Sequence, residues 1–61
     1  MDTKLYWYTI FYWDPKEDPG ETTLWAYSEE DAEKRFYMTH RKSTPFKAGY
    51  DIRKIMKEGA V

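Results

Sequence analysis

The first half of the chain holds two apolar runs separated by a polar segment. Residues 4–13 are almost wholly aromatic or β-branched, and this composition favours a strand because such side chains lose rotamer freedom in a helix. Residues 22–27 form a second strand-like run. Between them, residues 14–20 contain two prolines and a Pro-Gly pair, which are strong turn signals. The pattern predicts an antiparallel hairpin with a long loop.

A helical pattern follows the hairpin. Ser28 is placed to cap a helix, and Asp31 stands where a capping box puts its acid. Ala32 and Phe36 are four positions apart and share one helix face. We expect this helix to end at about residue 39 or 40.

A loop with one proline and one glycine leads to a third apolar run at residues 50–56. The run begins with the period of a strand, but Ile55 breaks the parity. We therefore expect a bulge or an early strand end near Lys54. The tail, residues 57–61, is expected to be frayed.

These elements predict a single α+β domain over residues 1–61, in ββαβ order, with a three-stranded antiparallel-type sheet and one helix packed on one face. One helix of this length covers only one face of the sheet. Side chains alternate along a strand, so residues 4–13 present two sets of rings. We expect the set that includes the lone polar Thr9 to be the outer one, and the tyrosine set remains the alternative. Trp25 and Tyr27 are also expected to point away from the helix.

The uncovered face is predicted to be a platform of aromatic rings, and such patches mark interaction sites. It fits a protein partner or a second copy of the chain, single-stranded nucleic acid stacked on the rings, or a solvated face without a partner. Base stacking is less favoured because Lys4 is the only cation in the two hairpin strands. The candidate partner-binding rings are Trp7, Phe11, Trp13, Trp25 and Tyr27.

Composition and charge narrow the class of protein. The chain has 61 residues, 20% of them aromatic, and no Cys, which predicts one small domain without disulfides in a reducing cytoplasm. The net charge of -1 conceals an asymmetry. Residues 1–30 hold two basic and seven acidic side chains, a net -5, and residues 31–61 hold eight basic and four acidic ones, a net +4. Such segregation can orient the protein on a charged partner. No apolar run approaches the length of a membrane span.

Catalysis and metal binding have little support in the sequence. The chain has no Cys nucleophile and no glycine-rich phosphate loop, and its single His40 has no Ser or acid at a fixed spacing. His40 is expected to cap the end of the helix or to face solvent. Capping and the helix dipole account for the acids at the helix start. We therefore expect no enzyme, no cofactor and no metal site.

Two segments carry a resemblance to a known family. Leu-Trp-Ala-Tyr-Ser-Glu-Glu-Asp-Ala (residues 24–32) and Ala-Gly-Tyr-Asp-Ile-Arg-Lys-Ile (residues 48–55) resemble the small early protein of short-tailed bacteriophages that inhibits host bacterial RNA polymerase. The resemblance covers about residues 4–56. It implies binding to the jaw region of the polymerase β′ subunit through basic residues of the third strand, with an acidic strip that helps to act on the sigma factor.

The resemblance also implies which charged residues of this chain correspond to the charged positions of the family. Lys54 falls on one key basic position. The second falls on Met56, which supplies no charge, although Lys57 is adjacent and Arg53 is an added cation. The acids that match the family are Glu30, Asp31 and Asp51, whereas Lys34, Tyr27 and Tyr37 replace acids.

The sequence thus leads to the expectation of a phage-encoded protein of the host bacterial cytoplasm that inhibits a host protein by stoichiometric binding, with RNA polymerase as the first candidate. One alternative is an inhibitor of a bacterial defence or DNA-repair enzyme. Another, from a different class, is a small nucleic-acid-binding module that uses the aromatic sheet face.

Overall fold

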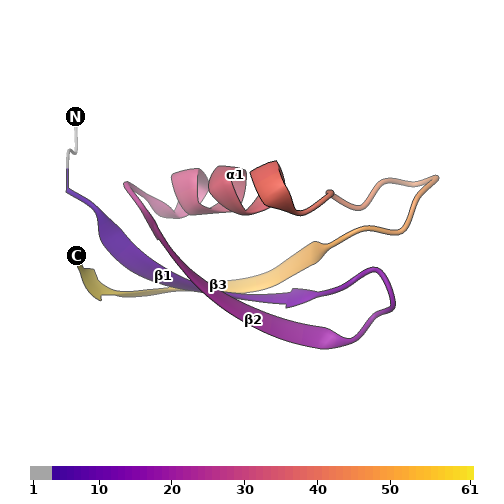
Figure 1. Cartoon of the computed structure of the whole chain (residues 1–61), viewed down its shortest axis with the longest axis horizontal. Coiled ribbons are helices and arrows are strands. Elements are labelled where there is room, and N and C mark those ends of the chain that lie inside the picture. The colour runs from indigo at the N-terminus through magenta and orange to yellow at the C-terminus, as the bar shows by residue number, and fades with distance from the viewer. Residues whose placement is uncertain (1–3) are drawn as a thin grey trace.

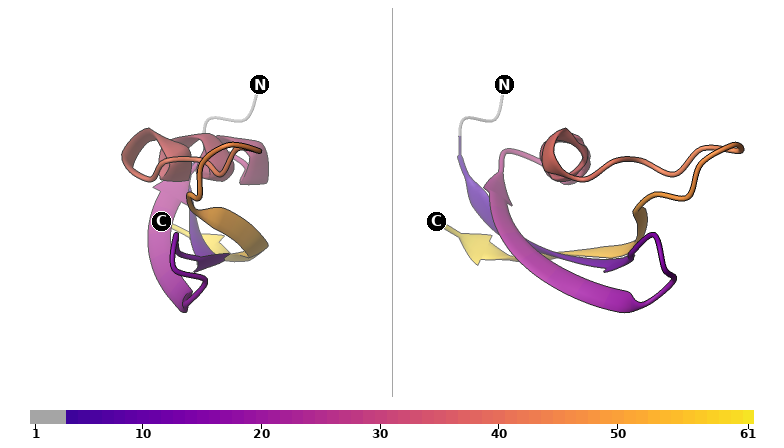
Figure 2. Two further views of the ribbon diagram at one scale, coloured as in Figure 1. Left: turned by 90° about the vertical axis from the view of Figure 1, so that its right-hand side faces the viewer. Right: turned by 45° about the vertical axis from the view of Figure 1, so that its right-hand side comes forward.

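The computed structural model describes residues 4–61, which form three strands and one helix (Figures 1 and 2). The elements are β1 (Tyr6–Trp13), β2 (Pro19–Ala26), α1 (Glu29–Thr39) and β3 (Asp51–Ala60). β1 is the middle strand of a sheet in the order β2-β1-β3 and pairs antiparallel with both neighbours. The helix lies over one face of this sheet. The predicted α+β fold in ββαβ order is confirmed.

A short, well-bonded turn joins β1 to β2. The Asp14 carboxylate accepts hydrogen bonds from the backbone N–H groups of Lys16 and Asp18 at 2.8 and 2.9 Å. Aspartate favours such turns because its short side chain reaches the backbone that follows it. The connection is therefore compact. β2 begins at Pro19, whereas the sequence predicted a start at residue 22.

Local capping starts α1 as predicted. The Ser28 hydroxyl accepts the backbone N–H of Asp31 at 3.1 Å, and the Asp31 carboxylate accepts the N–H of Tyr27 at 3.0 Å. The same carboxylate forms an ion pair with Arg35, one turn further on, at 2.9 Å. The Tyr27 hydrogen bond is the largest cause of a lowered pKa at Asp31, and Arg35 lowers it further against an opposing effect of burial.

The core lies between α1 and the sheet face beneath it. Its fully buried side chains, each 4% exposed or less, are Tyr8, Ile10, Ala26, Ala32 and Phe36. The tyrosine set of β1 therefore packs under the helix and the other set faces outward, as expected from the position of Thr9.

His40 ends the helix and extends the core. Its backbone N–H donates to the Phe36 carbonyl oxygen at 3.0 Å, which makes it the C-cap. Its ring stacks on the Phe36 ring, with centroids 4.1 Å apart and planes 2° from parallel. Tyr50 meets the His40 ring edge-on at 4.7 Å. Of the two alternatives expected for His40, a helix cap or a solvent-facing side chain, the structure shows the cap.

β3 is longer than predicted. Ala60 pairs with Tyr6, and the backbone N–H of Val61 donates to the Leu5 carbonyl oxygen at 3.0 Å. The expectation of a frayed tail over residues 57–61 is wrong. The backbone of β1 extends to Tyr6, and its otherwise unpaired N–H and C=O groups bind the tail.

A bulge keeps the apolar side chains of β3 over the core. The register with β1 shifts next to Phe11, where Arg53 is the extra residue of β3. Ile52 and Ile55, which differ in parity, both pack against the core as a result. The bulge predicted near Lys54 is confirmed.

The connection from α1 to β3 is a long loop that extends past the end of the helix (Figure 1). A parallel bridge between Lys42 and Tyr50 closes its base, where the Tyr50 N–H donates to the Arg41 carbonyl oxygen at 2.7 Å. No helix within residues 4–61 is long and apolar enough to cross a membrane.

Candidate protein-interaction surfaces

The sheet face opposite the helix carries exposed aromatic rings. Trp7 and Trp13 of β1 are each 38% exposed, and Trp25 of β2 is 53% exposed. Phe11 lies on the same side of β1 and is half-buried. No described element covers this surface (Figure 1), which we call the outer face.

Strand pairing arranges the outer face in four rows, because residues directly opposite one another share a face. In the order β2, β1, β3 the rows are Trp25-Trp7-Gly59, Thr23-Thr9-Met56, Glu21-Phe11-Lys54 and Pro19-Trp13-Asp51. The rings of Trp25 and Trp7 are neighbours, with centroids 5.9 Å apart. Thr9, in the middle of the face, is only 6% exposed, because larger neighbouring side chains surround it. The middle of the face is therefore recessed. Four of the five rings predicted from the sequence, those of Trp7, Phe11, Trp13 and Trp25, therefore form one surface.

The outer face carries few charges. Lys54 and Glu21 lie on either side of Phe11, and Asp51 lies beside Trp13. One cation with two acids does not make the basic groove that single-stranded nucleic acid requires beside its stacked bases.

β3 places cations along one edge of the sheet. It pairs with β1 only among the described strands, and the backbone N–H of Ile52, near the start of β3, donates to the Tyr37 hydroxyl at 3.2 Å. No described strand pairs with the second edge of β3 beyond this contact. Arg53 at the bulge and Lys54 on the outer face are both exposed, and we call this pair and the strand that holds it the basic edge. Lys57 is set apart from them, because its Nζ lies 3.7 Å from the centre of the Tyr6 ring, on the helix side of the sheet.

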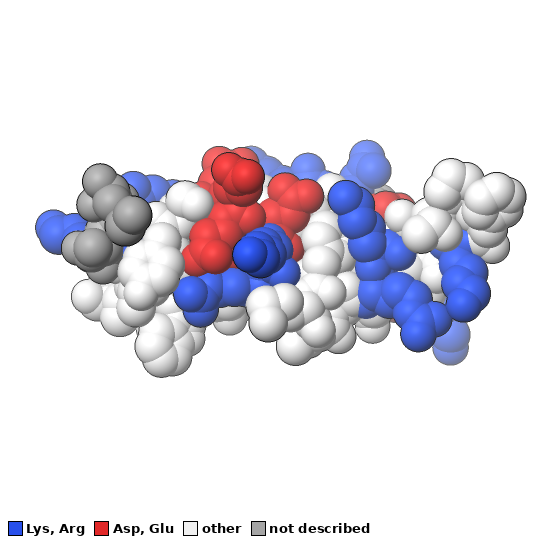
Figure 3. Space-filling model, turned by 90° about the horizontal axis from the view of Figure 1, so that it is seen from above, with Lys and Arg blue, Asp and Glu red and all other residues white. Residues whose placement is uncertain are grey.

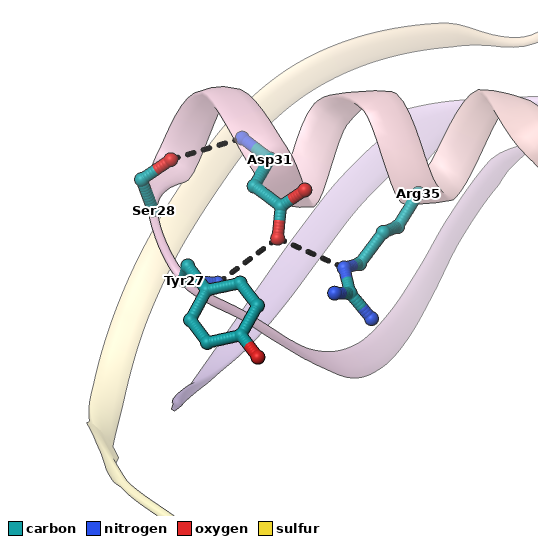
Figure 4. A network of polar contacts seen from close by, with 4 residues as sticks. All are labelled: Tyr27, Ser28, Asp31 and Arg35. Carbon is teal, nitrogen blue, oxygen red and sulfur yellow. Dashed lines mark hydrogen bonds and ion pairs between the residues drawn. The ribbon is translucent and has the colours of Figure 1, made fainter. Parts of the chain in front are cut away.

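The three acidic residues that match the family, Glu30, Asp31 and Asp51, lie in two places. Glu30 and Asp31 belong to the first turn of α1, and Asp51 begins β3. Figure 3 shows acidic side chains gathered over the helix and basic ones beside them, toward the long loop. Asp31 already bonds to Tyr27 and Arg35, so its place is explained by capping (Figure 4).

Tyr27 was expected to lie on the outer face with Trp25, but the structure places it elsewhere. β2 ends at Ala26 and the chain turns into the helix cap at Ser28, so the alternation of the strand does not extend to Tyr27. Its ring lies beside the helix, with the guanidinium carbon of Arg35 5.6 Å from the ring centre (Figure 4).

Sequence reasoning missed an exposed ring on the long loop. Phe46 is 96% exposed. Thr44 and Lys47 exchange backbone hydrogen bonds at 3.0 and 3.3 Å, and the Thr44 hydroxyl accepts the Lys47 N–H at 3.0 Å. The loop tip is therefore an ordered turn. The Thr-Pro pair before Phe46 is a local signal for such a turn, but it does not reveal which way the ring points.

Comparison of the chain with models of protein families, with curated proteins and with solved structures finds no match. Within residues 4–61, no group of three or more His, Asp or Glu side chains is placed to hold a metal ion.

Proposed function

We propose that this protein inhibits a host bacterial protein by stoichiometric binding, and that the partner is host RNA polymerase. In this proposal the protein is phage-encoded and acts in the host cytoplasm. The observation that carries the proposal is the basic edge, where exposed Arg53 and Lys54 lie on an edge strand of the sheet.

Two properties of the basic edge suit an acidic protein surface. The free backbone of an edge strand can pair with an extended segment of another chain. The Arg53 guanidinium can bind a carboxylate through two parallel hydrogen bonds. Lys54 lies directly across from Phe11, so a charged contact and an apolar contact are available side by side.

The family resemblance supports the choice of RNA polymerase. It implies that Lys54 occupies a basic position that contacts the jaw region of the β′ subunit. Met56 brings no charge to the second basic position of the family, and Arg53 provides a cation on the other side of Lys54. The contact proposed for this chain is therefore centred on residues 53 and 54.

Binding of purified components tests the proposal. The immobilised protein is mixed with purified bacterial RNA polymerase, the retained polymerase is measured, and transcript yield is followed in parallel. The double variant Arg53→Glu/Lys54→Glu is expected to bind at least about tenfold more weakly and to restore transcription, because two attractive contacts become repulsive. Failure of the unchanged protein to retain polymerase would remove this partner.

A matched variant separates the basic edge from net charge. Lys16→Glu/Lys34→Glu changes the net charge by the same amount, but its residues lie in the hairpin turn and on the helix. It is expected to retain polymerase like the unchanged protein, and an equal loss in both double variants would contradict a specific role of β3. If polymerase is not retained but the protein binds single-stranded DNA or RNA, and Trp7→Ala weakens that binding, the nucleic-acid alternative is supported instead.

A further inference from the structure

The outer face is laid out so that its two sides complement each other. Trp25 of β2 lies across β1 from Gly59 of β3, and Glu21 of β2 lies across β1 from Lys54 of β3. A large ring on one side thus corresponds to a position without a side chain on the other. An acid on one side corresponds to a base on the other.

We propose that the outer face binds a second copy of this chain in a face-to-face homodimer, with the two-fold axis along β1 between the two sheets. Rotation about this axis places β2 of each copy over β3 of the other and β1 over β1. Each row of the outer face then meets the same row in reverse order. This inference rests on the register of the outer face and not on the proposed inhibition of RNA polymerase, although the two contacts share Lys54 and Phe11.

The first row provides a fit of size. Trp25 of each copy lies over Gly59 of the other. Trp25 is half exposed, and a Cβ at Gly59 would have no atom within 4 Å, so the space above the glycine is open. The φ of +156° at Gly59 also disfavours any residue with a side chain there. The ring of one copy thus has a place on the other.

The third row provides a fit of charge. Glu21 of each copy lies over Lys54 of the other, which gives two ion pairs, one on each side of the Phe11 contact. In the fourth row Asp51 lies over Pro19, which carries no charge. The arrangement therefore brings no like charges together, and like-charge contacts are a principal barrier to association.

The shape of the face suits a second copy and limits the strength of the dimer. β2 bends toward the helix (Figure 2), so the sheet is convex on the outer side. Thr9 and Thr23 lie in the middle of the face and the tryptophans toward its ends, which compensates for the curvature. Three strands and four rows cover a rectangle of about 14 by 27 Å. The area of this rectangle is smaller than the roughly 800 Å² that each partner contributes to a standard interface. We therefore expect a weak dimer with a micromolar dissociation constant.

Charge reversal tests the two-fold arrangement directly. The full chain is studied by sedimentation velocity from micromolar to millimolar concentration, and the unchanged protein is expected to dimerise within this range. Glu21→Lys and Lys54→Glu are each expected to stay monomeric where the unchanged protein is dimeric, because each places like charges over one another twice. An equimolar mixture of the two variants is expected to form a heterodimer, because each then offers only opposite charges to the other.

A substitution that leaves all charges in place gives an independent measurement. Trp25→Ala is expected to raise the dissociation constant at least about tenfold, because a buried tryptophan is a typical binding hot spot. Met38→Ala, an exposed apolar position on the helix, is the matched control and is expected to dimerise like the unchanged protein. Far-UV circular dichroism and thermal unfolding confirm that each variant folds.

Three outcomes would overturn the homodimer. They are a monomeric unchanged protein at all concentrations, single charge variants that still dimerise, and a mixture of the two variants that stays monomeric. None of these measurements involves RNA polymerase. Trp25→Ala also keeps Arg53 and Lys54, so loss of the dimer and loss of polymerase binding are distinguishable.

Discussion

At the scale of single residues, the base of the long loop leaves no room for a side chain at Gly49. A Cβ there would lie 2.6 Å from the Arg41 carbonyl oxygen and 2.8 Å from two backbone atoms of Lys42. These atoms cannot swing aside as a flexible side chain would, so Gly49→Ala is expected to lower the free energy of unfolding by about 1–3 kcal/mol. Thermal denaturation measures this, with the exposed neighbour Ala48→Ser expected to stay within about 0.5 kcal/mol of the unchanged protein. Equal stability of Gly49→Ala and the unchanged protein would contradict the close approach.

At the scale of elements, the range of the contacts decided what could be predicted. The start of α1 was predictable because Ser28, Asp31 and Tyr27 are near neighbours in the chain and follow general capping rules. The length of β3 was not, because its partner β1 is distant in sequence, and the composition of residues 57–61 does not indicate that a free strand edge is there to bind them. The bulge of β3 was predictable in part. The break in alternation at Ile55 indicated that a bulge is present, but it did not show that Arg53 is the extra residue.

The capping carboxylate makes the start of α1 sensitive to acid. The Tyr27 hydrogen bond and Arg35 lower the pKa of Asp31 from its usual 3.8. The charged form therefore stabilises the fold above that pH, and this contribution is lost as the pH falls through the lowered pKa. Asp31→Asn is expected to be about 0.5–1 kcal/mol less stable at neutral pH, and the difference is expected to vanish in acid.

Urea denaturation over a series of pH values measures the effect of Asp31→Asn. Glu33→Gln, an exposed position in the same helix, is the control and is expected to stay within about 0.5 kcal/mol of the unchanged protein at each pH. A stability difference for Asp31→Asn that is the same in neutral and acid solution would show that its charge is not the cause.

At the scale of the whole molecule, strand alternation was enough to predict the members of the outer face but not their arrangement. Period two grouped Trp7 with Trp13, and the lone polar Thr9 in their set indicated that this set faces outward, with the tyrosine set as the alternative. Which residues lie opposite one another depends on the register and on two irregularities of β3, the bulge at Arg53 and a second register shift at Glu58, next to Trp7. The correspondence of Trp25 with Gly59 therefore appears only in the structure. Lys54 and Lys57 are three positions apart and lie on opposite sides of the sheet, as alternation requires once β3 is known to continue past residue 56.

The segregated charges predict how salt acts on the two proposed contacts. The chain is nearly neutral as a whole, but a net -5 in residues 1–30 is opposed by a net +4 in residues 31–61, and the basic edge lies in the positive part. Raising NaCl from about 0.1 to about 1 M shortens the screening length from about 10 to about 3 Å. Binding to RNA polymerase is therefore expected to weaken markedly, whereas the homodimer is expected to weaken much less because apolar rings make most of its contact.

Parallel measurements of the two dissociation constants over this salt range check the prediction. Polymerase binding is followed by titration of a labelled chain, and self-association by sedimentation. Polymerase binding that does not respond to salt would mean that Arg53 and Lys54 do not make the contact. A homodimer that dissociates as steeply as the polymerase complex would mean that the ion pairs of Glu21 and Lys54, rather than the rings of the outer face, hold the two copies together.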